Sequence, residues 1–280
     1  QKFVWQWKRE VMVSATAGTG GSVEPAEGWA AETEAYTVTA TPESGYRFYK
    51  WTGDVPRQKM FNATLSDIFR KPSSVSADFL SDGELTEVAA AQSGDWSAAE
   101  TWGGTVPGAD SKVVIAGKTV SVSAADALLV GAIEVKDGGV LRIWGADSNA
   151  SKPDPKTVVP LAGIAADSDL VLDVVGDFTV DGSSWVSVGG LNADYRVFVN
   201  VGGNLTLGAN GKFAVYGGAV EPDPDDVEKY MGDGAAVNVG SNLTTAAGAW
   251  VYPFAHGVKG SNVRFSVGGD VEIAAGGGFD

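Results

Sequence analysis

Apolar and polar residues alternate in short runs along much of the chain, and glycine and asparagine separate these runs. Residues 199–218 read VNVGGNLTLGANGKFAVYGG, with one alternating run on either side of the sequence GANG. Alternation with a period of two predicts β-strands, and Gly and Asn are typical of the turns between them. We therefore expect two short strands here rather than a flexible glycine-rich linker.

The same pattern recurs along the chain. Four segments share it and can be aligned with one another: residues 174–190, 201–218, 239–257 and 267–280. A polar residue follows the Gly or Ser of each segment: Asp177, Asn204, Asn242 and Asp270. These four residues are 27, 38 and 28 residues apart. The interval of 38 residues contains an insertion, residues 219–231, and removing about 11 residues of it restores a spacing of 27. A fixed period of this length indicates a solenoid. Residues 133–145 look like an earlier relative of the repeat.

Each repeat is expected to form one rung of a right-handed parallel β-helix with a period of about 27 residues. Leu205, Leu207, Phe213 and Val215 should point inward and stack on the preceding rung, on Phe178, Val180, Trp185 and Val186–Val188. The polar column is expected to be a ladder of turn residues whose side chains satisfy backbone groups. This ladder also accounts for the glycosylation sequons at Asn204 and Asn242 without glycans. A metal column is the less favoured alternative.

The N-terminal part has a different pattern. Residues 11–17, 35–41 and 74–79 alternate and are rich in β-branched residues, so each is expected to be a strand. Between the last two lies the block TPESGYRFYKWTGD. This block and the closing strand resemble the divergent InlB-type B-repeat, and the matching residues are Pro42, Gly45, Tyr46, Phe48, Trp51, Gly53, Asp54, Ala77 and Phe79. The resemblance implies a small β-rich module of bacterial surface and secreted proteins, usually in tandem and usually not catalytic.

Two roles are open for the aromatic residues of this block. Tyr46 and Trp51 can form a platform on which a sugar stacks, or they can pack in the core of the module. The core is favoured, because a module of this size without disulfides needs its aromatic side chains inside. Both residues are kept as candidate ligand-binding residues.

A polar and Ala-rich stretch, residues 80–93, joins this module to the next part. It is followed by Trp96, Trp102, Pro107-Gly108 and the strand-like run VVIAGKTVSVS. This order resembles G8-like segments and the opening of bacterial β-helix proteins of the pectin-lyase type. Trp96 and Trp102 are expected to cap the first rung, because the end of a stacked repeat exposes apolar surface. The expected domains are therefore 1–82, a joint and cap at 83–112, and a β-helix at 113–280, truncated at its C-terminal end.

Composition and charge narrow the functional classes. Hydrophobic residues make up 44% of the 280 residues and charged ones 20%, so a packed core is expected. The net charge of −15 argues against nucleic acid as a partner. The absence of Cys excludes disulfides and thiol catalysis, and no apolar run is long enough for a membrane helix. His256 is the only His, which excludes sites that need several, and it is expected in a surface turn.

A β-helix also raises the hypothesis of a polysaccharide lyase or glycoside hydrolase, and such enzymes need paired carboxylates or a Lys or Arg base. The basic residues of the repeat are scattered, and none recurs at rung spacing beside an acidic column. They are Lys136, Arg142, Arg196, Lys212, Lys229 and Arg264. The insertion holds Asp223, Asp225 and Asp226, which could bind calcium, although a solvated loop is favoured.

The sequence thus predicts an all-β, extracellular or cell-surface bacterial protein segment that is not catalytic. A B-repeat-like module leads into a β-helix stalk that serves adhesion or contacts a polysaccharide or surface glycan. Tyr46, Trp51, Asp223, Asp225 and Asp226 are the candidate ligand-binding residues. Two alternatives stay open: an enzyme whose active site lies beyond residue 280, and a purely structural spacer. The chain begins at Gln1 and ends within a repeat, so a fragment of a longer protein is expected.

Overall fold

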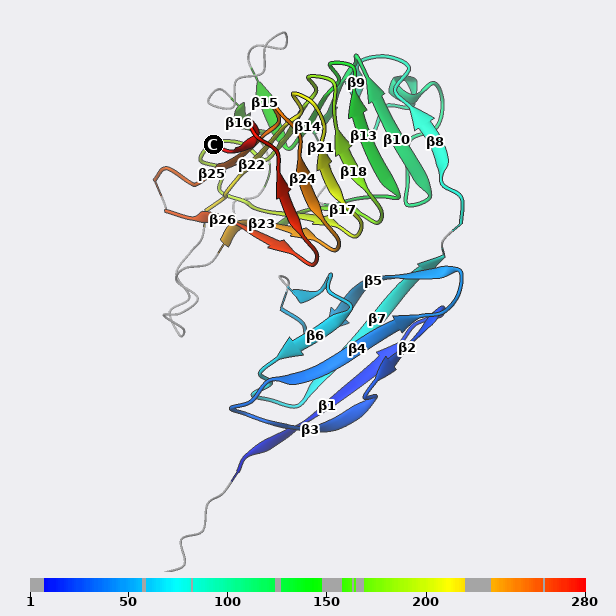
Figure 1. Ribbon diagram of the computed structural model, residues 1–280, viewed down its shortest axis with the longest axis vertical. Coiled ribbons are helices and arrows are strands. Elements are labelled where there is room, and N and C mark those ends of the chain that lie inside the picture. The colour runs from blue at the N-terminus through cyan, green and yellow to red at the C-terminus, as the bar shows by residue number, and fades with distance from the viewer. Residues whose placement is uncertain are drawn as a thin grey trace, which may run out of the picture. The chain divides into compact units, whose positions relative to one another are not determined.

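The computed structural model is all-β and divides into two compact units, Gln1–Gly83 and Glu84–Asp280 (Figure 1). The division falls next to the expected end of the first module at residue 82. The structure describes residues 8–56, 59–81, 83–123, 127–147, 158–162, 164, 169–219, 233–258 and 260–280.

The first unit contains two sheets. The larger has the order β3-β1-β7-β5 and the smaller the order β2-β4-β6. In the larger sheet β1 and β7 are parallel, and the other pairings are antiparallel. The strands are β1 (Glu10–Ala17), β2 (Gly21–Glu24), β3 (Glu27–Ala31), β4 (Tyr36–Pro42), β5 (Tyr46–Gly53), β6 (Thr64–Asp67) and β7 (Ser73–Ser81). The three predicted strands are confirmed as β1, β4 and β7, and alternate residues such as Val11 and Val13 enter the core.

The second unit is built from three parallel sheets, named here after their first strands (Figure 1). The β8 sheet contains β8 (Thr86–Ala89), β10 (Ser111–Ala116), β13 (Ala132–Lys136), β18 (Phe178–Val180), β21 (Leu205–Leu207), β24 (Leu243–Thr245) and β27 (Val271–Ile273). The β9 sheet contains β9 (Gly94–Asp95), β11 (Thr119–Val122), β14 (Val140–Ile143), β19 (Trp185–Val188), β22 (Lys212–Tyr216), β25 (Trp250–Phe254) and β28 (Gly278–Phe279).

The third sheet, the β12 sheet, contains β12 (Ala127–Val130), β17 (Asp169–Val174), β20 (Arg196–Val201), β23 (Asp233–Val239) and β26 (Asn262–Val267). From β12 onward the chain visits the β12, β8 and β9 sheets in that cyclic order, and each circuit adds one strand to each sheet. A short antiparallel pair, β15 (Gly145–Asp147) and β16 (Val158–Pro160), lies between two circuits. The repeats predicted from the sequence are these circuits.

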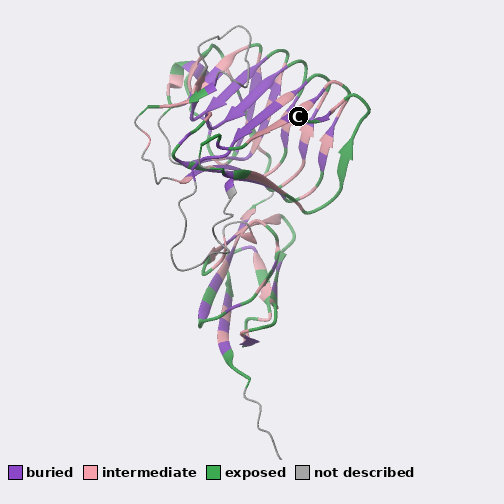
Figure 2. Cartoon of the chain, turned by 90° about the vertical axis from the view of Figure 1, so that its left-hand side faces the viewer, coloured by how far each residue is buried: buried purple, intermediate pink, exposed green. Residues whose placement is uncertain are grey.

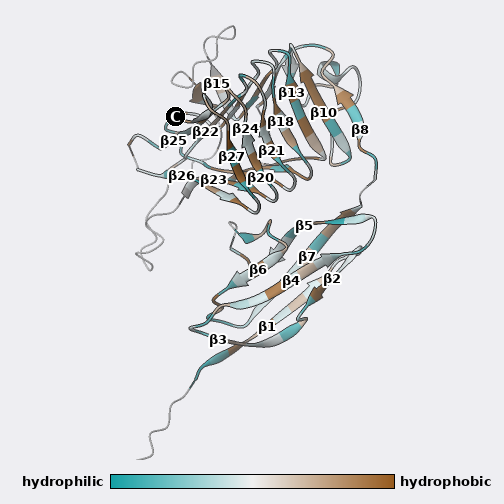
Figure 3. Ribbon diagram, viewed as in Figure 1, coloured by the Kyte–Doolittle hydropathy of each residue, from teal (hydrophilic) through white to brown (hydrophobic). Residues whose placement is uncertain are grey.

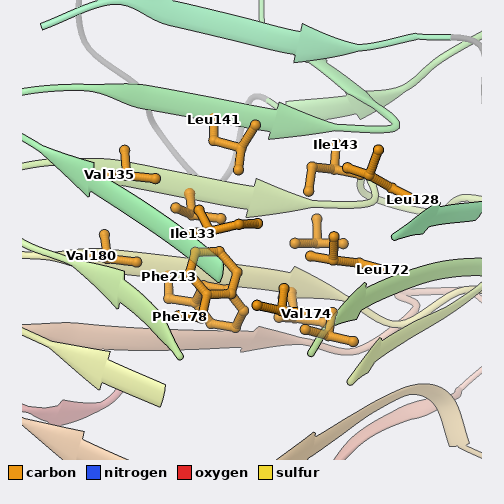
Figure 4. Close-up of a cluster of buried hydrophobic side chains, with 14 of the residues drawn as sticks. Leu128, Ile133, Val135, Leu141, Ile143, Leu172, Val174, Phe178, Val180 and Phe213 are labelled. Atoms are coloured by element: carbon orange, nitrogen blue, oxygen red, sulfur yellow. The ribbon is translucent and has the colours of Figure 1, made fainter. Parts of the chain in front are cut away.

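The inward-facing residues of the three sheets form one continuous core (Figure 4). Leu205 and Leu207 stand opposite Phe178 and Val180 of the preceding circuit, as predicted, and all four are fully buried. The rings of Phe178 and Phe213 meet edge to face with centroids 5.6 Å apart. Figure 2 shows burial concentrated on the stacked strands, and Figure 3 shows hydrophobic residues on the same strands. Burial of this apolar surface is the main stabilising contribution to the unit.

The predicted ladder of turn residues is confirmed. The backbone N–H of Asn204 donates to the Asp177 carboxylate at 2.7 Å, and that of Asn242 donates to the Asn204 side-chain oxygen at 3.2 Å. The N–H of Asp270 donates to the Asn242 oxygen at 2.8 Å. Each polar side chain therefore holds the next circuit in register through a turn N–H that the strands leave without a partner.

A second polar ladder lies on the outer face of the β12 sheet and was not expected. Asn200 donates to Asp173 at 2.7 Å and accepts from Asn238 at 2.8 Å, and all three side chains are buried. Arg196 on β20 is ion-paired with the strand of the preceding circuit, since its Nε is 2.7 Å from the Asp169 carboxylate. One sequence-based expectation about the aromatic residues needs correction. Trp185 does not point inward: Val186 and Val188 do, and Trp185 faces outward with the separate cluster around Tyr216.

The first circuit is closed by aromatic residues. Trp96 and Trp102 are buried against the core and meet edge to face at 4.8 Å. The Trp102 indole N–H donates to the Trp96 carbonyl at 2.7 Å, which fixes the short 3-10 turn Ala99–Trp102. This is the capping position that the sequence predicts for both residues.

Candidate ligand-binding face

The candidate aromatic residues of the first unit pack inside it. Trp51 is fully buried, and its indole N–H donates to the Asn62 carbonyl at 2.9 Å. Tyr46 is half-buried, and its ring lies where a Cβ on Gly20 would stand. Because no face of the Trp51 indole is exposed, this burial favours the core role over the sugar platform.

A shallow depression of about 550 Å³ lies beside the end of β5, lined by Asp54, Asp67, Phe69 and Lys71 among others. Both of its carboxylates are paired within the unit. Lys71 Nζ is 3.2 Å from the Asp54 carboxylate, and Lys59 Nζ is 2.8 Å from that of Asp67. These contacts give the two acids a structural role in the unit.

Asp223, Asp225 and Asp226 lie outside the described residues, so a role in ligand or calcium binding stays a prediction. Within the residues that the structure does describe, no group of three or more His, Cys, Asp or Glu side chains is placed to hold a metal ion.

Aromatic residues gather instead on the outer face of the β9 sheet. Trp185 projects from β19 and Tyr216 from β22, while Trp250, Tyr252 and Phe254 project from β25. The strands are in parallel register, with Lys212 opposite both Trp185 and Trp250 and with Tyr216 opposite Phe254. Alternation explains the gathering, because Val186, Phe213, Val215 and Val251 occupy the inward positions of the same strands.

Four rings of this face are nearly parallel. Trp185 stacks on Tyr252 with centroids 5.9 Å apart and planes 27° apart. Tyr252 and Phe254 are 6.2 Å and 8° apart, and Phe254 and Tyr216 are 5.0 Å and 12° apart. Trp185 and Tyr216 are buried, whereas Trp250, Tyr252 and Phe254 are partly exposed. We name the set Trp185, Tyr216, Trp250, Tyr252 and Phe254 the aromatic face.

The electrostatics of the aromatic face differ from those of the acidic chain around it. The Lys212 ammonium lies 6.0 Å from the centroid of the Trp185 ring, within reach of a cation–π interaction. Burial raises the pKa of the Tyr252 phenol, and the Asp280 carboxylate raises it further, so this hydroxyl stays protonated and can donate a hydrogen bond. The face therefore combines flat apolar surface, a cation and a hydroxyl donor.

His256 was expected in a surface turn, and the structure corrects this. Its side chain is buried, and Nδ1 accepts a hydrogen bond from the backbone N–H of Val258 at 3.2 Å. The backbone of His256 also bonds to Ser261 and Gly260, which closes the loop after β25. The ring is therefore part of the loop packing rather than of an exposed site.

Sequence reasoning missed the aromatic face, although a signal for it was present. Aromatic residues occupy alternate positions in WVYPF at 250–254, and Trp185 and Tyr216 precede them in earlier repeats. Reading the outward positions of successive repeats as one column brings these residues together.

One family match was found. Residues 11–83 match the family model of the divergent InlB B-repeat domain, which supports the identification of the first unit and suggests a bacterial surface protein. The second unit has no family match, so its resemblance to G8-like segments stays a prediction. No curated protein and no solved structure is similar enough to the chain to count as a match. Among the described residues, no helix has the length and apolar character needed to cross a membrane.

Proposed function

We propose that the chain is a non-catalytic segment of an extracellular or cell-surface bacterial protein, and that its second unit is a right-handed parallel β-helix that binds carbohydrate. The cyclic order of strands through three parallel sheets supports the β-helix, with right-handed circuits as the general rule for parallel crossovers. The family match of the first unit supports the location.

The aromatic face is the observation that carries the binding role. Three of its rings are partly exposed on one strand. Two of these, Tyr252 and Phe254, stack on the buried rings of Trp185 and Tyr216 from the neighbouring strands, so they are held in place before any ligand arrives. A rigid array of aromatic rings presents flat apolar surface to the faces of pyranose rings at little entropic cost. Adhesion to a surface glycan is the function that such a face supports.

The test is retention of polysaccharides by the purified chain, with chain cleavage measured in the same samples and with calcium present or absent. Trp250→Ala is expected to weaken retention by up to about tenfold, since an aromatic contact contributes about 0.5–1.5 kcal/mol beyond its buried area. Trp29→Ala is the matched control, because Trp29 is 63% exposed and belongs to the first unit.

The other outcomes decide against the proposal. Cleavage of any polysaccharide would show that the chain is catalytic. Equal loss of retention in Trp29→Ala and Trp250→Ala would place binding elsewhere. Failure to retain any polysaccharide would leave the segment as a structural spacer.

A further inference from the structure

We propose that the depression beside the end of β5 binds an extended peptide segment of a partner protein, in which an aliphatic residue stands two positions from an acidic one. This inference goes beyond the proposed carbohydrate binding, which concerns the second unit, and neither one depends on the other.

The chain leaves the small sheet at this depression with its backbone unpaired. β6 is an edge strand of that sheet, and its pairing with β4 ends at Asp67. The next three residues, Ile68, Phe69 and Arg70, line the depression, and none of them takes part in a backbone hydrogen bond within the described part of the chain. An extended peptide that continues along this edge can satisfy such N–H and C=O groups by strand addition.

These three residues also present their side chains as a strand would. Ile68 is exposed, Phe69 is buried, and Arg70 is exposed again. The Phe69 ring packs inward, where it meets the Tyr36 ring edge to face with centroids 6.4 Å apart. Ile68 and Arg70 therefore lie on the same side of the segment, and a strand beside them places its matching residues two positions apart.

The side chains around Ile68 give the depression an apolar part. Ile68 is 39% exposed, and Val55 and Pro56, which line the same depression, are half-buried. The volume of about 550 Å³ lies within the range of clefts that hold ligands. An aliphatic side chain of a partner would find apolar contacts here that water does not offer.

The charge that stays available at the depression is positive. The Asp54 carboxylate accepts from Lys71, and the Asp67 carboxylate accepts from Lys59. Arg70 is exposed and forms no ion pair with any other described residue. A guanidinium presents parallel N–H donors that match the two oxygens of a carboxylate. Charge complementarity therefore favours an acidic side chain of the partner at Arg70.

An extended peptide is the occupant that meets all three features together. The unpaired backbone groups need donors and acceptors in alternation, which a polypeptide carries and an inorganic anion or a fatty acid does not. The apolar part and Arg70 are separated as alternate residues of a strand are. An aliphatic residue and an acidic residue of one extended segment can thus occupy both at once.

The experiment uses two libraries of acetylated, amidated heptapeptides with random uncharged residues, one with Glu and one with Gln at the central position. Each library is selected on the intact wild-type chain. Peptides selected from the Glu library are expected to carry Val, Ile or Leu two positions from the Glu. They should bind about twofold to fivefold more tightly than the same peptides with Gln, the range of an exposed ion pair.

Three variants assign the preference to single side chains. Arg70→Gln should abolish the preference for Glu over Gln, and Ile68→Ser should abolish the selection of aliphatic residues and keep the preference for Glu. Arg9→Gln is the matched control, because Arg9 is an exposed Arg of the same unit that is paired with Glu32, and it should change neither result. Added salt should reduce the preference for Glu in the wild type and have no such effect in Arg70→Gln.

N-methylated forms of a selected peptide test the backbone contacts without changing any side chain. In a strand, alternate N–H groups point to the same neighbour. Methyl groups on one set of alternate nitrogens should therefore abolish binding, and methyl groups on the other set should be tolerated. Equal effects of the two sets would contradict strand addition.

The remaining outcomes overturn the inference. Equal binding of Glu and Gln peptides, an unchanged preference in Arg70→Gln, or selection of no peptide at all would each show that the depression does not bind such a segment. Carbohydrate retention is measured separately, through Trp250→Ala in the second unit. Loss of the proposed function therefore leaves the peptide result standing, and failure of the peptide test leaves carbohydrate binding untouched.

Discussion

At the scale of single residues, Asp54 and the glycine before it have a structural role in the first unit. Gly53 has φ = +91°, and a Cβ there would lie 2.3 Å from the Ser74 carbonyl oxygen. This conformation turns the chain so that the Asp54 carboxylate accepts from the Ser74 N–H at 3.0 Å and from Lys71 at 3.2 Å. The Gly-Asp pair of the B-repeat pattern therefore ties the end of β5 to the start of β7.

Removal of this carboxylate should destabilise the first unit. Asp54→Ala is expected to lower its free energy of unfolding by about 1–2 kcal/mol, because the Ser74 N–H loses a charged acceptor. Native-state hydrogen exchange at the amides of β5 and β7 would measure this loss in the first unit alone. Glu43→Ala, which removes an exposed carboxylate of the same unit, is the control and should have little effect.

The same contact should depend on pH. The hydrogen bonds from Ser74 and Lys71 lower the pKa of Asp54 below its ordinary value of 3.8. Because the folded pKa is lowered, the stabilisation is fully present above the unfolded pKa and is lost as the pH falls through 3.8 and then through the folded value. The difference between wild type and Asp54→Ala should therefore shrink below about pH 4, and a difference that grows on acidification would contradict this role.

Trp185 shows why one residue-level expectation failed. In β19 all four residues, Trp185 to Val188, are buried, so no exposed polar position marks the outer side of the strand. Alternation assigns residues to two faces but does not tell which face enters the core when both are covered. The register with Phe213 and Val215 supplies this information, and it is available only from the fold.

At the scale of elements, two ladders of polar side chains hold the stacked strands in register. The turn ladder through Asn204 and Asn242 was predictable, because its members recur at the repeat spacing and adjoin Gly or Ser. The ladder through Asp173, Asn200 and Asn238 was not predicted, although its spacings of 27 and 38 residues match those of the repeat. A single Asn inside an apolar strand gives no sign that its neighbours in space are polar too.

Asn200 is the central member of the second ladder and should be the most sensitive to substitution. Asn200→Ala is expected to lower the stability of the second unit by about 2–3 kcal/mol, because the buried Asn238 amide and Asp173 carboxylate each lose a partner. Asn262→Ala, an exposed Asn on β26 of the same sheet, is the control. Similar melting temperatures for the two variants would show that the ladder contributes little.

At the scale of the whole molecule, the aromatic residues of the two units have different roles. The aromatic residues of the first unit were predictable as a core, because a small module without cysteine has few other ways to bury apolar surface. A search for local motifs misses the aromatic face of the second unit, because Trp185, Lys212 and Tyr252 come from different repeats. The stacking of the circuits brings them to one face. The other candidates, Asp223, Asp225 and Asp226 of the acidic insertion, lie outside the described residues.

Hydroxyl-radical footprinting of the intact chain, with and without a saturating polysaccharide that it retains, tests the binding role of the second unit most directly. We expect protection of Trp250, Tyr252 and Phe254 and no change at Trp29, which is exposed on the first unit. Protection of Trp29 with unchanged oxidation of the three β25 aromatics would place the ligand on the first unit and contradict the account.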